Sequence, residues 1–268
     1  MSEQLVVLED CGNYACITLN RPDQKNVLNR AALLQLQDIL RQCVGRYASV
    51  ILTGAGSDFC AGTDVEEQSG QNARGKAFCA GVDLRERNEW VRKGAKIRGD
   101  NVRNKWYDTM GTIIRNHPAI FIAAVNGLAL GGGATLVNVC DLAIMAEEAE
   151  IGIPRISWGI YPGTAGASTQ VRVLRKHAAW PILTGRSISA AAAVEIGMVN
   201  LAVPAGKLLD EAKALAAHIA KFDPIALDWC KKALDQIPSQ VADWSVALEY
   251  GRGVASIIRE QTGRGREA

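Results

Sequence analysis

Residues that ligate transition metals are scarce in this sequence. It has three histidines and seven cysteines in 268 residues, and no two cysteines have the Cys-x-x-Cys spacing of a zinc or redox motif. The histidines are also far apart along the chain. We therefore expect no metal site, and reduced cysteines in a cytoplasmic protein fit this usage best.

An excess of charge of one sign is also lacking. The 30 basic and 28 acidic residues leave a net charge of +2, so neither a nucleic acid nor a membrane is expected as a partner. No apolar run is long enough to span a bilayer. The first residues enter a strand pattern directly, with neither a secretory hydrophobic region nor an arginine-rich transit segment. These absences leave a globular protein for which we expect a cytoplasmic location.

Glycine, in contrast, is concentrated at one point. A strand-like run at residues 119–125 and an Asn-Gly turn precede three glycines at 131–133. An apolar stretch at 134–139 then predicts a helix. Glycines at a strand-to-helix turn let the backbone approach a ligand, and the N–H groups at a helix N-terminus suit a developing negative oxygen. The alternative is a tight turn that packs small residues.

One segment occurs twice in tandem. Residues 56–67 recur 19 positions later as residues 75–86, and seven of the twelve positions are identical, including the shared Phe-Cys-Ala-Gly-x-Asp. Because the segment is repeated only once, a local duplication explains it better than a solenoid does.

These motifs, in this order, resemble the crotonase (enoyl-CoA hydratase/isomerase) superfamily. The resemblance covers residues 5–234 and includes residues 51–56, both Phe-Cys-Ala-Gly segments, the three glycines, residues 158–163 and Leu-Thr-Gly at 183–185. It implies a mixed α/β (α+β) fold, with a spiral of repeated ββα units over residues 1–203. The helical patterns of residues 204–268 would then form a C-terminal helical region that packs in homotrimers or dimers of trimers.

The resemblance also implies an oxyanion hole for an acyl-CoA thioester. Its two backbone N–H donors would be those of Gly132 and of Val82 in the second copy of the repeat, while Thr63 holds the matching place in the first copy. We prefer Val82, since its distance to the glycine turn is close to that of the family. The residues implied to contact coenzyme A are Lys25, Ala80, Asp83 and Arg85. No cofactor beyond the CoA moiety of the substrate is expected.

The acid–base residues of the family are replaced in this chain. Typical hydratases have glutamates at the positions held here by Thr135 and Arg155. A threonine hydroxyl is no base near neutral pH, and an arginine cannot accept a proton. Arg155 could hold a substrate carboxylate or carbonyl, and Tyr161 could donate a proton. Glu86 and Glu89 are further candidates, or else solvated surface residues.

Three functions remain open on the sequence. The first is an enoyl-CoA hydratase/isomerase-type lyase with non-standard acid–base residues. The second is a CoA-thioester decarboxylase or C–C bond hydrolase in which Arg155 orients the bond to be cleaved. The third is a non-catalytic acyl-CoA-binding protein or an RNA-associated homologue, for which the basic run at residues 90–106 is the only support. Acyl group, chain length and pathway are not indicated.

Overall fold

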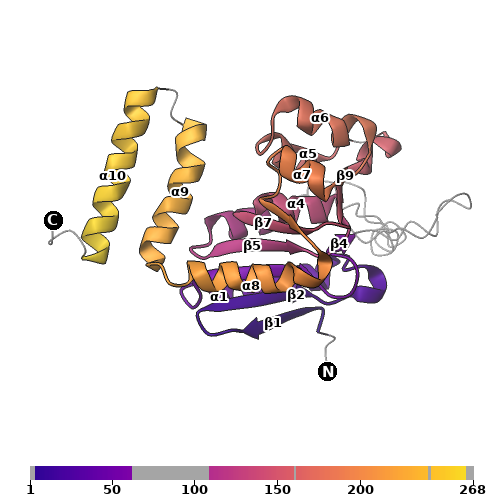
Figure 1. The fold of residues 1–268 in the computed structure, drawn as a ribbon, viewed down its shortest axis with the longest axis horizontal. Coiled ribbons are helices and arrows are strands. Elements are labelled where there is room, and N and C mark those ends of the chain that lie inside the picture. The colour runs from indigo at the N-terminus through magenta and orange to yellow at the C-terminus, as the bar shows by residue number, and fades with distance from the viewer. Residues whose placement is uncertain (1–3, 62–108, 160, 241–242, 264–268) are drawn as a thin grey trace, which may run out of the picture.

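Two sheets form the centre of the computed structural model, which describes residues 4–61, 109–159, 161–240 and 243–263 (Figure 1). The six-stranded sheet has the order β1-β2-β3-β5-β7-β10 and the four-stranded sheet the order β4-β6-β8-β9. The strands are β1 (Val6–Asp10), β2 (Tyr14–Leu19), β3 (Ser49–Gly54), β4 (Cys60–Ala61), β5 (Ile120–Val125), β6 (Ala129–Leu130), β7 (Leu142–Ala146), β8 (Glu150–Gly152), β9 (Ile188–Ser189) and β10 (Leu201–Val203).

The chain alternates between the two sheets from β3 to β8. Each of the pairs β3–β4, β5–β6 and β7–β8 places its first strand in the large sheet and its second in the small one. Neighbours are parallel throughout, apart from the antiparallel pairs β1–β2 and β8–β9. Strands β3 and β5 are buried along their whole length, as expected for central parallel strands made of continuous apolar runs. The predicted mixed α/β spiral is confirmed.

The helices cover the sheets and extend beyond them. They are α1 (Arg30–Cys43), α4 (Gly132–Val139), α5 (Gly163–Gln170), α6 (Arg175–Thr184), α7 (Ala190–Glu195), α8 (Leu208–Ile219), α9 (Pro224–Gln240) and α10 (Trp244–Thr262), with 3₁₀ turns η1 (Pro22–Gln24), η2 (Pro154–Trp158) and η3 (Ala205–Lys207). Helix α8 packs on β3, β5 and β7, whereas α9 and α10 pack mainly on each other (Figure 1). Within the described ranges no helix has the length and apolarity to span a membrane.

Local sequence signals locate most of these elements. The side chain of Ser189 accepts a hydrogen bond from the Ala192 N–H and so caps the N-terminus of α7. Beyond β10 the described residues are helical with their connecting turns, as the patterns of residues 204–268 indicate. Helix α8 lies beyond residue 203 but packs on strands of the large sheet. The division of the chain at residue 203 therefore stays a prediction.

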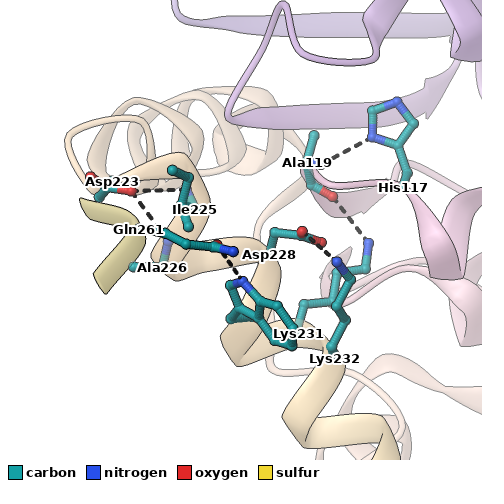
Figure 2. Close-up of polar contacts among 10 residues, drawn as sticks. His117, Ala119, Asp223, Ile225, Ala226, Asp228, Lys231, Lys232 and Gln261 are labelled. Carbon is teal, nitrogen blue, oxygen red and sulfur yellow. Dashed lines mark hydrogen bonds and ion pairs between the residues drawn. The ribbon is translucent and has the colours of Figure 1, made fainter. Parts of the chain in front are cut away.

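A buried ion pair anchors α9 to the core. The Lys231 ammonium, 4% exposed, lies 2.8 Å from Asp141 Oδ2 and donates to the carbonyl oxygens of Ile114 and Ala119 at 2.9 and 3.0 Å. Figure 2 shows Lys231 extending from α9 to the Ala119 backbone. Asp141 in turn accepts from the Phe121 N–H at 2.8 Å. Since all three ammonium protons have acceptors, the cost of burying this charge is offset.

We expect Lys231→Met to lower the free energy of unfolding at pH 7 by about 3–5 kcal/mol, because it leaves the Asp141 carboxylate buried without its cation. Denaturant unfolding measures this loss. Lys232→Met is the matched control, since Lys232 pairs with Asp228 at the surface and such pairs contribute less than about 1 kcal/mol.

The pH dependence of this loss has a defined sign. Burial raises the pKa of Asp141, and Lys231 opposes that rise; without Lys231 the folded-state pKa moves further above the unfolded value. A carboxyl with a raised folded pKa stabilises the fold below its unfolded pKa and loses that contribution as pH rises. The deficit of Lys231→Met relative to the natural protein should therefore shrink between pH 7 and pH 4. A deficit that is constant or grows over that range would contradict this assignment.

Candidate functional site

Three neighbouring parallel strands of the small sheet end at one edge. Ala61 of β4 pairs with Leu130 of β6, which pairs with Gly152 of β8. Side chains and backbone groups beyond the carboxyl ends of parallel strands converge at such an edge. The glycine turn follows β6 directly and η2 follows β8, so the chain brings two of its predicted site segments together here.

The glycine turn needs glycine at two positions for structural reasons. Gly131 has φ 54° and ψ −103°, a backbone conformation that side chains other than hydrogen disfavour. A Cβ on Gly133 would lie far inside contact distance of the Cys60 carbonyl oxygen. The Gly131 N–H also donates to the Gly152 carbonyl at 2.8 Å. The first turn of α4 is thereby packed directly on β4, with Gly132 at the start of the helix.

Thr135 lies in the first turn of α4 and is 2% exposed. Its hydroxyl donates to the Gly131 carbonyl at 3.2 Å, and its N–H donates to the same oxygen at 3.0 Å. The Thr135 side chain is thus bound to the glycine turn itself. This geometry gives Thr135 a role in holding the turn. A threonine hydroxyl is not a general base near neutral pH.

Arg155 lies within η2, and Tyr161 follows η2. Arg155 is half-buried and lies three residues beyond the end of β8. Tyr161 is 56% exposed, and its hydroxyl oxygen accepts from Gln170 Nε2 of α5 at 2.7 Å. Arg155 therefore follows closely after β8, whereas Tyr161 lies on a more exposed loop.

Lys25 belongs to a loop held against the start of β4. It has φ 51°, and the next residue, Asn26, is 1% exposed and donates to the carbonyls of Ala55 and Asp58 at 2.8 and 2.6 Å. The Arg21 N–H donates to the Asn26 side-chain oxygen at 2.9 Å. This role of Asn26 was not predicted from the sequence, where the signal was an asparagine directly after Lys25 in a polar loop.

The first copy of the tandem repeat supplies β4. Phe59 and Cys60 are fully buried, and β4 lies beside β6 against the glycine turn. The oxyanion donor expected next to this turn is Val82 of the second copy. The residues predicted there, Ala80, Val82, Asp83 and Arg85, lie outside the described ranges, as do Thr63, Glu86 and Glu89. The role of Val82 stays a prediction.

The described segments at this edge carry no carboxylate. Residues 59–61, 131–135, 152–159 and 161 include neither Asp nor Glu. Among the described residues, no group of three or more His, Cys, Asp or Glu side chains is placed to hold a metal ion. The charged side chain on these segments is Arg155. The edge can therefore polarise an oxygen at the start of α4 and hold an anionic or carbonyl group at Arg155.

Known proteins and families are similar to this chain over most of its length. A family model described as enoyl-CoA hydratase/isomerase matches residues 10–75 and 71–250, two stretches that overlap at residues 71–75. The chain is 33% identical over 254 residues to a 2,3-dehydroadipyl-CoA hydratase from Escherichia coli, covering 94% of this chain and 86% of that protein.

Two further similarities involve a second relative and a solved structure. A hydroxycinnamoyl-CoA hydratase-lyase from Pseudomonas fluorescens is 29% identical over 225 residues, covering 83% of this chain and 74% of the relative. The crystal structure of an enoyl-CoA hydratase from Bacillus anthracis superposes with a TM-score of 0.76 at 32% identity, covering 94% of this chain and 90% of that one.

Replacing Gly133 tests the close packing of α4 on β4. Gly133→Ala should lower the free energy of unfolding by about 3 kcal/mol or more, because the added methyl group meets a backbone oxygen that cannot rotate away. Gly253→Ala is the control: it lies in α10 with open space around it, and alanine should stabilise that helix by about 0.5–1 kcal/mol. Equal effects of the two variants in denaturant unfolding would disprove the packing argument.

Proposed function

Because this chain belongs to the enoyl-CoA hydratase/isomerase family, we propose that it is an enzyme that binds CoA thioesters at the edge where β4, β6 and β8 end. The observation that supports this most is the glycine turn, which brings the start of α4 against β4. The backbone conformation of Gly131 disfavours a side chain, and the close contact of Gly133 with β4 leaves no room for one. Lys25, on the loop tied to the start of β4 by Asn26, is proposed to contact the CoA moiety.

The proposed chemistry develops negative charge on the thioester oxygen. Gly132, at the N-terminus of α4, is one donor to that oxygen, and the helix dipole adds to the stabilisation. Val82 is proposed as the second donor on the family resemblance. One donor of this kind typically contributes ~10²–10³ in rate. No cofactor beyond the CoA moiety of the substrate takes part.

Hydration should be slow on this scaffold. General acid–base catalysis typically contributes ~10²–10⁴ in rate, and the positions of Thr135 and Arg155 supply no carboxylate for it. The hydroxyl of Thr135 is bound to the Gly131 carbonyl. A reaction that forms the thioester enolate without a protein base suits these residues better than the addition of water does.

A second candidate, C–C bond cleavage, is favoured by the absence of Asp and Glu from the described segments of the edge together with the presence of Arg155. In decarboxylation of a 2-carboxyacyl-CoA, the bond to the carboxylate breaks and its electron pair remains as the thioester enolate, while CO₂ departs. A proton from water or from Tyr161 then completes the product. These reaction steps require no base, and Arg155 would orient the carboxylate before cleavage.

We propose that the protein assembles as a homotrimer or a dimer of trimers. Large hydrophobic side chains are exposed on the C-terminal helices and around α5 and α6. They are Ile225, Leu234, Trp244, Val246 and Leu248 on α9 and α10, and Val171, Leu174, Trp180 and Leu183 around α6. Exposed apolar surface of this extent is typical of protein–protein contacts.

Two measurements test the proposed function. Calorimetry with acetyl-CoA should detect binding, and mass spectrometry after incubation with crotonyl-, malonyl-, 3-oxoacyl- and hydroxycinnamoyl-CoA should detect a product from one class. No heat of binding at millimolar acetyl-CoA would overturn the proposal. Binding without any product would support the acyl-CoA-binding alternative, and retention on RNA at physiological salt the RNA-associated one.

The same assay tests the two replaced positions. Natural protein should hydrate crotonyl-CoA very slowly, and Thr135→Glu with Arg155→Glu should raise that rate by ~10², more than the single changes combined, because the two groups act as a unit. The isosteric pair Thr135→Gln with Arg155→Gln is the control. A folded glutamate pair with no gain, or ordinary hydration rates in the natural protein, would show that these positions are not the acid–base sites.

A further inference from the structure

The side chain of Asn26 joins its own loop to the turn between β3 and β4. Its amide group donates to the carbonyl oxygens of Ala55 and Asp58 at 2.8 and 2.6 Å. These carbonyls stand at the two ends of residues 55–58, which we call the β3–β4 turn. The Asn26 side-chain oxygen accepts from the Arg21 N–H at 2.9 Å. One buried side chain therefore closes the loop that contains it and attaches that loop to the turn.

The β3–β4 turn is held on its other side by residues that follow β5. Asn126 accepts through Oδ1 from the Gly54 N–H at 3.1 Å, and its amide donates to the Gly56 carbonyl at 3.0 Å. A Cβ on Gly127 would lie far inside contact distance of the Ser57 carbonyl oxygen, so this backbone packs directly on the turn. The β3–β4 turn is thus fixed to the packed centre of the large sheet.

The same turn leads into the strand that packs against the glycine turn. Cys60 begins β4 two residues after Asp58, and its N–H donates to the Leu128 carbonyl at 3.1 Å. The Cys60 carbonyl oxygen lies where a side chain on Gly133 would be. A continuous series of described contacts therefore connects Asn26 to the first turn of α4.

The backbone next to Asn26 has an uncommon conformation. Lys25 and Asn26 have φ values of 51° and 58°, and among the described residues they are the non-glycine positions with positive φ. Asparagine tolerates this left-handed region better than lysine does. Such conformations persist where surrounding contacts enforce them. The contacts of Asn26, which is 1% exposed, supply this constraint, so the direction in which the Lys25 side chain leaves the loop depends on them.

We propose that Asn26 is a positioning residue for the CoA moiety: by attaching its loop to the β3–β4 turn, it sets the place of Lys25 relative to the first turn of α4. Because Asn26 is buried, it acts through Lys25 and not by contact with the ligand. The part that concerns CoA rests on the proposed function, in which Lys25 contacts that moiety. The part that concerns the loop rests on the hydrogen bonds of Asn26 alone.

Hydrogen exchange measured by mass spectrometry on Asn26→Asp tests the loop. The carboxylate keeps the side-chain acceptor and loses both donor bonds, so amides of residues 20–27 and 54–58 should exchange about tenfold faster, while those of β5 keep their natural rates. Asn20→Asp is the matched control, since the Asn20 amide also donates to a backbone carbonyl, that of Gln4 at 2.9 Å. Unchanged exchange at 54–58 in Asn26→Asp, or equal acceleration there in the control, overturns the proposal.

A second variant covers the case in which Asn26→Asp unfolds. Asn26→Gly also removes the side-chain hydrogen bonds, but glycine adopts a positive φ without strain. Faster exchange confined to residues 20–27 and 54–58 supports the proposal. Acceleration of all segments together, or of none, overturns it.

A double-mutant cycle on the affinity for free CoA, measured by calorimetry, tests the part that concerns the ligand. Asn26→Gly should weaken binding about fivefold in the natural protein. In a Lys25→Met background the same change should weaken it less than about twofold, because the place of residue 25 matters only while it carries the ammonium group. Equal effects in the two backgrounds overturn this part, since a merely structural role would give that result.

Failure of the proposed function gives a different pattern. The natural protein would then bind no CoA, the part that concerns the ligand would fall with it, and the exchange experiment would still decide the role of Asn26 in the loop. Undiminished CoA binding by Lys25→Met would overturn the part that concerns the ligand while the proposed function stands.

Discussion

The site edge depends on the close approach of the first turn of α4 to β4. Gly133 allows this approach because a side chain there would meet the Cys60 carbonyl, and Gly131 turns the chain through a positive φ before the helix begins. The Gly131 N–H ties the turn to the end of β8. Three strands, one turn and one helix are held together by backbone contacts, so this geometry is independent of most side chains.

That independence leaves the scaffold compatible with different side chains around the glycine turn. Backbone donors at the start of α4 do not change when Thr135 or Arg155 occupies a neighbouring position. The side chains around them decide the reaction, since they supply or withhold protons and orient charged groups. Among the described segments of the edge, Arg155 supplies charge and Thr135 is bonded back to the turn. The proposed chemistry follows from this difference.

Buried polar side chains fix the parts that surround this edge. Asn26 holds the loop of Lys25 against the start of β4, Asn138 joins α4 to α5, and Lys231 anchors α9 through Asp141. Each forms hydrogen bonds or an ion pair with backbone or side-chain groups of elements far apart in the sequence. Such directed contacts specify position more than they add to net stability, because burial of polar groups offsets much of the gain.

The sequence by itself predicted the glycine turn and the helix of α4, because glycine and apolar periodicity are local properties, and its resemblance to the crotonase superfamily predicted the spiral of ββα units. Only the tertiary structure decided that the first copy of the repeat forms β4. Two copies with the same Phe-Cys-Ala-Gly residues have equal local propensity, and the pairing of β4 with β6 is a contact between segments distant in sequence. The partners of Asn26, Asn138 and Lys231 were likewise invisible in the sequence, because a side-chain hydrogen bond between distant segments leaves no periodic pattern.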